Sequence, residues 1–302
     1  MNVSSPVVNG GEVTLVRKIS TEKIIQLYNE LGVSVDKFFQ GIEFVEVYRC
    51  KASGLEFYSP STIAGDANFY ESLDKVAPNY YSRWKWEHET VIKYLRKDDN
   101  VLEIGAAYGT FLKECSNRGA AVAVGLELNQ NAVVGAQKNG IDMRGEFVED
   151  HAILNEGKYD IVTSFQVVEH IGNIISFMDA SIKCLKPNGL LAISVPNNDC
   201  YFFKNDHYHT LNLPPHHMGL WKEDSLRNLG MILDLKIIAV HKQPASYQNF
   251  GMYYSVFLKK YLGLNNEKLS MVYKYTKSLA KLLMLISPPK YGACITVVFQ
   301  KK

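Results

Sequence analysis

Two carboxylates flank a turn of small residues in the middle of the chain. The segment VLEIGAAYG, residues 101–109, is an apolar run that continues into Gly105, Ala107 and Gly109. Small residues after a strand let the backbone approach a ligand closely, and amides at the following helix start favour an anionic group. Glu103 would repel a pyrophosphate but could accept a hydrogen bond from an ammonium group. Glu127, about 20 residues later, could bind both hydroxyls of a ribose. An adenosine that carries an amino acid therefore fits better than a dinucleotide.

Histidines gather in a second segment, residues 199–226, which reads DCYFFKNDHYHTLNLPPHHMGLWKEDSL. It holds four of the chain's eight histidines: His207, His209, His216 and His217. Histidine titrates near neutrality and is the commonest general base, so we expect His217 or His216 to remove a proton. His217 is slightly preferred, because Trp221 could hold it against an aromatic wall. The structural alternative is that one of the pair packs the loop while the other is solvated.

The elements that must position these residues follow residue 80, where strand-like and helix-like segments alternate. Such alternation predicts an α/β fold with a doubly wound, mostly parallel sheet covered on both faces. The final segment, YGACITVVFQKK, predicts one more strand, which we expect to be antiparallel. It follows an aromatic-rich insertion at about 243–288. The other expected strands are 101–104, 121–126, 159–165, 189–195 and 235–240, with a weak one near Met143.

The first 79 residues predict a small α+β module. A polar cap at Ser20, apolar residues at helical spacing and a closing Gly32 indicate a helix. Residues 44–60 alternate apolar and polar side chains on both sides of a turn, which predicts a β-hairpin. An amphipathic helix is expected over 79–100. Its aromatic residues are Tyr80, Tyr81, Trp84 and Trp86. Packing against the core explains them, and a lid over the ligand is the alternative role for Tyr81.

Composition narrows the class of protein. The 302 residues carry a net charge of +2, with 47% hydrophobic and 21% charged residues and no block of like charge, so nucleic acid is an unlikely partner class. Five scattered cysteines support neither a disulfide framework nor a zinc cage. We expect no metal site; one built from Asp206 and the histidines is the less favoured alternative. No secretory signal is recognised, and the apolar stretch from Leu279 is too short to span a bilayer, so a cytoplasmic protein without a transmembrane segment is expected.

The turn motif resembles that of the class I S-adenosylmethionine-dependent methyltransferases, an acidic residue followed by three alternating glycines. The motif here is Glu103-Ile-Gly105-Ala-Ala107-Tyr-Gly109, with alanine at the middle glycine position. The resemblance covers roughly residues 80–302. It includes KYDIVTSFQVVEHIGN at 158–173 and LKPNGLLAISVPN at 185–197. It implies a Rossmann-like methyltransferase fold with a seven-stranded sheet, and S-adenosyl-L-methionine as cofactor.

Carried over residue by residue, the resemblance implies a binding site for this cofactor. Glu103 and Gly105 would hold the methionine part, within the turn that Ala107 and Gly109 complete. Glu127 would hold the ribose, with Leu128 beside it. The other implied contacts are Glu146 and Phe147 at the adenine, and Phe165 and Gln166 in the methyl-donor pocket. Phe165 as a core residue and Glu146 as a solvated one remain the alternatives.

Glu169-His170 resembles the family's Glu-His loop. His170 is therefore a second candidate for the base, beside the alternative of a hydrogen-bonding pair at a helix start. The resemblance extends to Pro-x-His before an aromatic residue in the histidine-rich segment, matched by Pro214, His216 and Trp221.

The sequence defines the methyl acceptor less closely than it defines the cofactor. The hairpin segment YRCKASGLEFYSP resembles the second knuckle of a zinc ribbon that precedes some methyltransferases of sugar and polysaccharide pathways. Ser53 replaces the second cysteine, so a four-thiolate site cannot form. We expect methylation of a hydroxyl on a small molecule, with a sugar of a surface polysaccharide as one acceptor class and a homodimer as one assembly. The alternatives are an NAD-dependent oxidoreductase and a non-catalytic cofactor-binding protein on the same fold.

Overall fold

The structure is a computed structural model that describes residues 3–76, 84–245, 250–262, 271–276, 278, 282 and 291–302. Tyr80, Tyr81 and much of the expected insertion lie outside these residues. Among the residues described, no helix combines the length and the apolar character that crossing a membrane requires.

A seven-stranded sheet forms the larger part of the molecule, with strand order β10-β11-β8-β7-β4-β5-β6. The strands from β8 to β6 pair in parallel, whereas β11 pairs antiparallel with both β8 and β10. This confirms the doubly wound, mostly parallel sheet predicted from the sequence. The strand bounds are β4 Asn100–Ile104, β5 Val122–Leu126, β6 Asp142–Arg144, β7 Tyr159–Phe165, β8 Leu185–Pro196, β10 Leu235–Lys242 and β11 Cys294–Lys301.

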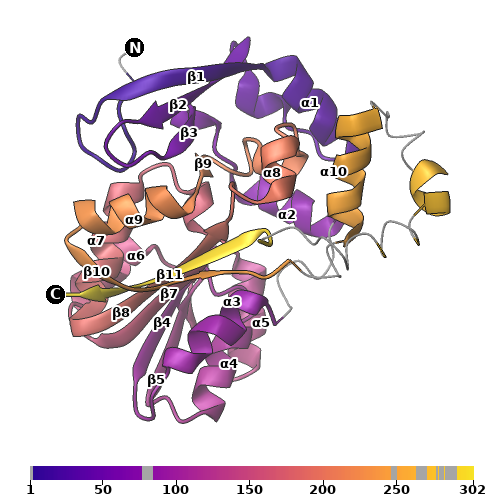
Figure 1. Ribbon diagram of the computed structural model, residues 1–302. Coiled ribbons are helices and arrows are strands. Elements are labelled where there is room, and N and C mark those ends of the chain that lie inside the picture. The colour runs from indigo at the N-terminus through magenta and orange to yellow at the C-terminus, as the bar shows by residue number, and fades with distance from the viewer. Residues whose placement is uncertain are drawn as a thin grey trace.

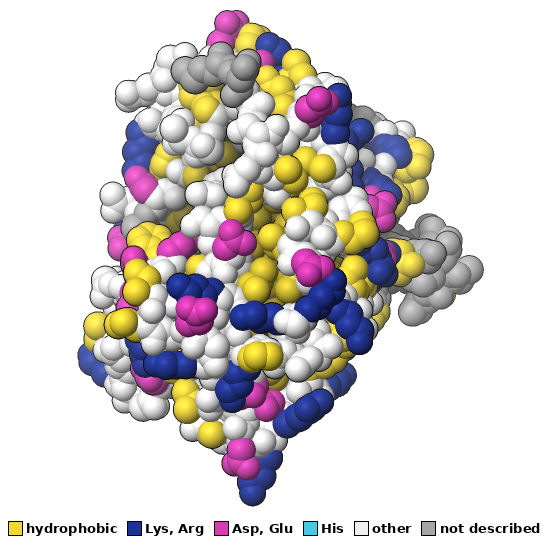
Figure 2. All heavy atoms as spheres, turned by 90° about the vertical axis from the view of Figure 1, so that its left-hand side faces the viewer, with side chains coloured by type: hydrophobic (Ala, Val, Ile, Leu, Met, Phe, Trp, Pro, Cys, Tyr) yellow, Lys and Arg dark blue, Asp and Glu magenta, His cyan; other side chains and the backbone are white. Residues whose placement is uncertain are grey.

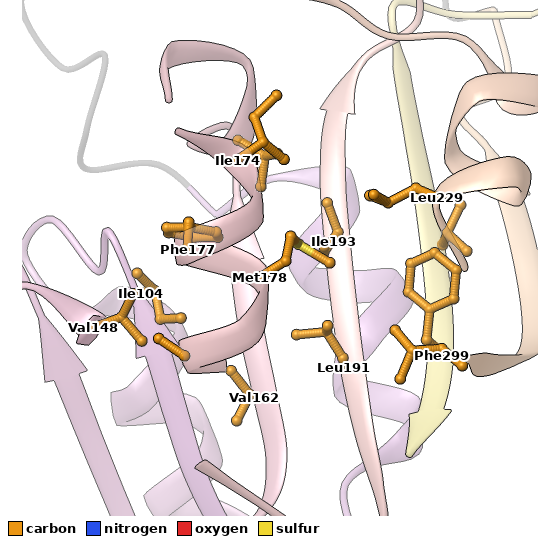
Figure 3. Close-up of a cluster of buried hydrophobic side chains, with 14 of the residues drawn as sticks. Ile104, Val148, Val162, Ile174, Phe177, Met178, Leu191, Ile193, Leu229 and Phe299 are labelled. Atoms are coloured by element: carbon orange, nitrogen blue, oxygen red, sulfur yellow. The ribbon is translucent and has the colours of Figure 1, made fainter. Parts of the chain in front are cut away.

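Helices cover both faces of this sheet (Figure 1). On one face, Met178 of α7 points toward Ile193 of β8, Phe177 points toward Ile104 and Val148, and Leu229 of α9 lies in the same core (Figure 3). A second apolar cluster fills the other face, under α3 and α4. The helices of the two faces are α6 Val148–Leu154, α7 Ile174–Cys184 and α9 Glu223–Ile232 on the first, and α3 Trp86–Val91, α4 Thr110–Asn117 and α5 Gln130–Lys138 on the second.

A separate four-stranded sheet, with strand order β1-β2-β3-β9, lies at one end of the molecule. The predicted hairpin is present, because β2 (Phe44–Cys50) pairs antiparallel with β3 (Glu56–Ser59). Two strands of this sheet were not predicted: β1 (Val13–Ser20) at one edge and β9 (Gly219–Leu220) at the other. Because β9 comes from the histidine-rich segment, the N-terminal sheet is completed by a part of the chain far away in sequence.

Two local predictions differ from the structure. The helix expected over 79–100 is, among its described residues, the short α3 followed by a 3-10 turn at Ile92–Tyr94. The side chain of Ser20 makes no capping hydrogen bond at α1 (Thr21–Glu30), although Gly32 does follow the helix in a left-handed conformation. At the start of α3, the Lys85 amide donates a hydrogen bond of 3.3 Å to Nδ1 of His88.

The N-terminal sheet shares its core with the rest of the chain. Cys50 and Leu55 of the hairpin belong to the same buried cluster as Leu102 of β4 and Trp221. Three further helices lie nearby: α2 Ala67–Val76, α8 Tyr201–Asn205 and α10 Phe250–Leu262. Basic and acidic side chains are interspersed on the face that Figure 2 shows, as the absence of charge blocks in the sequence predicts.

Candidate functional site

The turn after β4 is held by its own backbone. The amides of Gly105 and Ala106 both donate to the carbonyl oxygen of Leu126 on β5, at 2.8 and 3.0 Å. Gly105, Ala107 and Gly109 have φ angles of +74°, +48° and +73°, and Gly109 is the residue that starts α4. This left-handed region is costly for residues with a side chain, so Ala107 occupies a glycine-like position. The small residues of the motif are therefore required by the backbone of the turn.

The Glu127 carboxylate is fixed beside this turn. Its Oε2 accepts a hydrogen bond of 2.9 Å from the Ala107 amide, and its Oε1 accepts one of 2.8 Å from the Asn129 amide. A carboxylate offers about four lone-pair sites, so each oxygen can still accept another hydrogen bond. Glu127 is thus oriented by the chain with acceptor capacity left for a pair of hydroxyl groups.

Glu103 is buried at the end of β4, with 3% of its surface exposed. Among the described residues, its Oε2 has no hydrogen-bond partner. Burial raises the pKa of Glu103 well above its ordinary value, and the charge of Glu127 raises it further, against an opposing effect of Lys85. An unpartnered buried carboxyl is costly, so a cationic ligand group beside it would be strongly favoured.

A cavity of about 570 Å³ lies over the turn and joins these residues. It falls within the 300–1,000 Å³ that is common for ligand pockets. Of the predicted cofactor-binding residues, Gly109 alone is absent from its lining. The predicted residues that line it are Glu103, Gly105, Ala107, Glu127, Leu128, Glu146, Phe147, Phe165 and Gln166.

At one end of the cavity, Glu146 and Phe147 follow β6. Glu146 Oε1 is held 2.7 Å from Nδ1 of the buried His151, whose Nε2 lies 2.8 Å from the Tyr159 hydroxyl. Phe147 is 58% exposed. An oriented carboxylate beside an exposed ring suits a flat, hydrogen-bonding group such as a purine, which is the role that the sequence predicts for this pair.

Phe165 and Gln166 stand where β7 ends. Gln166 has a φ of +57°, its amide donates to the Ser194 carbonyl at 2.8 Å, and its side-chain nitrogen lies 3.3 Å from Cys294 Sγ. The Phe165 ring meets the His88 ring edge-on at a centroid distance of 4.9 Å. Phe165 is therefore both a buried core residue and part of the cavity wall, so the two readings of this residue are compatible.

Sequence reasoning missed several lining residues from the segment before β4. Tyr70 and Glu71 of α2, together with Lys85 and His88 at α3, line the same cavity. No motif marks them: Tyr70 and Glu71 reach the cavity through the packing of the N-terminal module onto the sheet, whereas Lys85 and His88 reach it from α3, which covers the sheet itself.

Three histidines from distant segments meet at the cavity wall. His170 follows β7, and its ring lies 4.7 Å from that of His216 and 5.0 Å from that of His217, centroid to centroid. The rings of His216 and His217 stack at 4.5 Å. His170 and His216 line the cavity, whereas His217, which is 5% exposed, lies behind them.

Burial governs the protonation of these histidines. It lowers the pKa of His170 to about 4 and that of His216 to about 3, and the latter is lowered further by His170. The pKa of His217 is also lowered well below its ordinary value, first by burial and then by its two neighbours. All three rings are therefore neutral at pH 7.

The other members of the histidine-rich segment lie elsewhere. His207 is exposed, and His209 packs edge-on against Phe202 and Phe203. Asp206 accepts a hydrogen bond from the Tyr208 amide and is not among the three residues that could together ligate an ion. The concentration of four histidines in sequence thus contributes two, His216 and His217, to the cluster.

Comparison with known proteins identifies the family. Residues 79–240, more than half of the 302 residues, match the family model described as a methyltransferase domain. The chain belongs to the methyltransferase family. Ubiquinone biosynthesis O-methyltransferases of Bartonella tribocorum and Escherichia coli are 32% and 33% identical over 102 and 104 residues. These matches cover 32% and 33% of this chain and 41% and 43% of those proteins, so the chain spans less than half the length of the curated relatives it matches.

Solved structures agree on the fold of this methyltransferase. A SAM-dependent methyltransferase from Thermotoga maritima superposes with a TM-score of 0.50 at 15% identity, covering 78% of this chain and 95% of that one. A chain of a Haloferax volcanii complex between a methyltransferase and its activator gives 0.52 at 14% identity, covering 79% and 96%. The family's cofactor is S-adenosylmethionine, and the alternative of an NAD-dependent oxidoreductase is not favoured.

The cavity of this methyltransferase fits that cofactor. The unpartnered Glu103 carboxyl is placed for an ammonium group, and Glu127 retains acceptor sites for two ribose hydroxyls. At Gly105, an added Cβ would lie 2.4 Å from Val167 Cγ2, so the backbone leaves no room for a side chain at this point.

Proposed function

We propose that the chain binds S-adenosylmethionine in this cavity and methylates a hydroxyl group of a small-molecule acceptor. The observation that carries the proposal is that one cavity joins the two carboxylates, Glu103 and Glu127, to a wall made by His170 and His216. The match to O-methyltransferases over a third of the chain supports an oxygen acceptor. A sugar hydroxyl is the acceptor class that the resemblance of the hairpin favours.

The chain's own residues bind and orient the donor. When bound, S-adenosylmethionine supplies an electrophilic methyl group on a sulfonium sulfur. Glu103 pairs with its ammonium group, and Glu127 holds its ribose through oxygens that the Ala107 and Asn129 amides keep in place. An in-line displacement depends on orientation and on the exclusion of water, which a cavity enclosed by both parts of the chain provides.

The acceptor side lies under the N-terminal module. Tyr70 of α2 packs edge-on against His170, at a centroid distance of 5.5 Å, and its hydroxyl lies 3.4 Å from the His216 carbonyl oxygen. His170 and His216 line the cavity, so either can reach an acceptor hydroxyl, whereas His217 supports them from behind. The sequence favours His217 as the base. We propose instead that His216 or His170 accepts the proton of the acceptor hydroxyl.

The donor site is tested through Glu127. Replacing Glu127 with alanine removes a bidentate charged acceptor, so S-adenosylhomocysteine should bind about 30- to 150-fold more weakly by calorimetry, equivalent to roughly 2–3 kcal/mol. Glu22→Ala is the matched control, because Glu22 is exposed on α1 and is not in the cavity lining. Unchanged affinity in Glu127→Ala would remove this residue from the ribose site.

The proton-accepting wall is tested by turnover. Candidate extracts are incubated with isotopically labelled S-adenosylmethionine, and labelled products are identified by mass spectrometry. His216→Ala or His170→Ala should lower the methylation rate about 10²- to 10⁴-fold while affinity for S-adenosylhomocysteine is kept. His207→Ala, in the same segment but exposed, should keep the full rate. If both cavity variants keep wild-type turnover, no histidine of the wall takes part.

A further inference from the structure

We propose that His170, His216 and His217 together bind one divalent transition-metal cation, with Zn²⁺ as the representative ion. One ring nitrogen of each residue lies within 4.8 Å of those of the other two. Zinc ligands stand about 2.0–2.1 Å from the ion, which places them roughly 3.3 Å apart in a tetrahedron, so the rings need to close by about 1.5 Å at most. Side-chain rotations of this size are small for adjacent rings.

The tautomers of the three rings are set by oxygen atoms outside the cluster. His170 Nδ1 lies 2.5 Å from the His216 carbonyl oxygen, and His216 Nδ1 lies 2.8 Å from the Leu211 carbonyl oxygen. A backbone carbonyl can only accept, so both Nδ1 atoms carry the proton. The lone pair of each neutral ring is then on Nε2.

His217 is set by a relay of amides. Its Nδ1 lies 3.0 Å from Asn212 Oδ1, the Asn212 side-chain nitrogen donates to Asn198 Oδ1 at 2.8 Å, and the Asn198 side-chain nitrogen donates to the Pro196 carbonyl at 3.4 Å. The fixed carbonyl at the end of the relay orients both amides, so Asn212 offers its oxygen to His217. Metal-binding histidines usually donate their second ring nitrogen to such an oxygen, and here all three rings do.

A buried carboxyl group stands beside the cluster. Glu169 Oε1 lies 3.9 Å from His170 Nε2, its side chain is 1% exposed, and its Oε2 has no hydrogen-bond partner among the described residues. Burial raises the pKa of this carboxyl group to about 8, so it is protonated at pH 7 and the three uncharged imidazoles are the ligands. Imidazole ligands favour Zn²⁺ and similar ions over Mg²⁺ or Ca²⁺, which prefer oxygen ligands.

The role of this ion in catalysis rests on the proposed function, whereas the binding of the ion itself does not depend on that function. Because His170 and His216 line the cavity, a bound ion would face the acceptor side. A cation there would lower the pKa of an acceptor hydroxyl that coordinates it. The acceptor hydroxyl would then lose its proton to water, and its oxygen would attack the methyl group without an imidazole base.

Metal binding is measured on the full chain without donor or acceptor. Protein freed of metal with EDTA is titrated with Zn²⁺ by calorimetry and with Co²⁺ by visible absorption, whose intensity distinguishes tetrahedral from octahedral coordination. We expect one ion per chain and a tetrahedral Co²⁺ spectrum. His170→Ala and His216→Ala should weaken Zn²⁺ binding more than 100-fold, and Asn212→Leu, which removes the acceptor for His217, about 10- to 100-fold. His207→Ala should bind like the wild type.

Two results would overturn the site: a wild-type chain that binds no Zn²⁺ or Co²⁺, or equal losses in His207→Ala and in the cluster variants. Because the cluster is buried, some variants could fail to fold, so the melting temperature of each is measured. The wild type provides the independent readout, since ¹⁵N-histidine NMR should show three Nε2 signals that shift on Zn²⁺ addition while the others stay. Failure of the Glu127→Ala test would leave these outcomes unaffected, so the two proposals fail separately.

Discussion

Glu103 and Glu127 show how two carboxylates in one cavity acquire different roles. Both oxygens of Glu127 accept backbone hydrogen bonds, which hold the side chain in place. Glu103 has a buried oxygen without a partner among the described residues, and burial raises its pKa. The environment therefore makes Glu127 an oriented acceptor and Glu103 a group that ionises when a cation arrives.

Glu103 should couple the binding of the methyl donor to the release of a proton. Its raised pKa keeps the carboxyl protonated to higher pH in the free chain, and a bound ammonium favours the carboxylate, so donor binding should release a proton. Affinity for S-adenosylhomocysteine should accordingly rise with pH until the free carboxyl has ionised. Calorimetry near pH 6.5 in buffers of different ionisation enthalpy measures this release, and Glu103→Gln, which has no such proton, should abolish it. Proton uptake, or no exchange in the wild type, would contradict the role of Glu103.

At the scale of elements, the connection between β4 and α4 is the feature that makes the cofactor site. It needs left-handed backbone at three alternate residues, two amides bonded to β5, and close approach to Val167, which lies two residues beyond the end of β7. Each requirement is a backbone requirement. The side chains of the motif matter here mainly by being small.

Gly105→Ala should therefore destabilise the fold more than a left-handed glycine elsewhere does. Gly140→Ala is the control, because its φ of +77° matches the +74° of Gly105 but no atom lies within 4 Å of its added Cβ. Gly140→Ala should cost about 1 kcal/mol from backbone strain, and Gly105→Ala a further 1–3 kcal/mol from the contact with Val167. Urea unfolding measures both, and equal losses would show that the Val167 contact is relieved without cost.

At the scale of the molecule, the N-terminal module and the methyltransferase sheet are joined by a buried charge network as well as by a shared core. Glu56 on β3, 6% exposed, lies 3.4 Å from Arg17 of β1, 2.7 Å from Arg49 of β2 and 3.2 Å from Lys222 at the start of α9. Burial raises the pKa of Glu56, but Arg49, Lys222 and Arg17 outweigh that effect and leave it lowered. One carboxylate thus connects segments from both parts of the chain.

Replacing Glu56 with glutamine should lower the free energy of unfolding at pH 7 by about 2 kcal/mol. This is less than the 3–5 kcal/mol of a fully buried pair, because the three cations remain partly in water. A lowered pKa contributes stability above the unfolded value that is lost as the pH falls through the folded one. The difference between variant and wild type should therefore shrink in acid. Glu12→Gln, which breaks the exposed pair with Lys51, should change stability little. A Glu56 effect that persists unchanged at pH 3 would contradict the ionic origin.

Local pattern determined most of the fold and of the cofactor site. Most of the strands from β4 to β8 are rich in apolar residues, with the three-residue β6 as the exception, and the turn after β4 needs small residues for backbone reasons, so short segments carry both signals. The carboxylates follow from the same pattern, since the ends of parallel strands meet at one edge of the sheet.

Tertiary structure alone decided the rest, because it depends on contacts between residues far apart in sequence. Tyr70 enters the cavity only when the N-terminal module packs on the sheet, and Gly219–Leu220 is a strand only because β3 supplies its partner. His170 is separated by 46 residues from His216, whose carbonyl oxygen it contacts, and no local spacing encodes that approach. The sequence thus determined where the proposed cofactor site is formed, whereas the contacts between the N-terminal module and the sheet decided which side chains line the rest of the cavity.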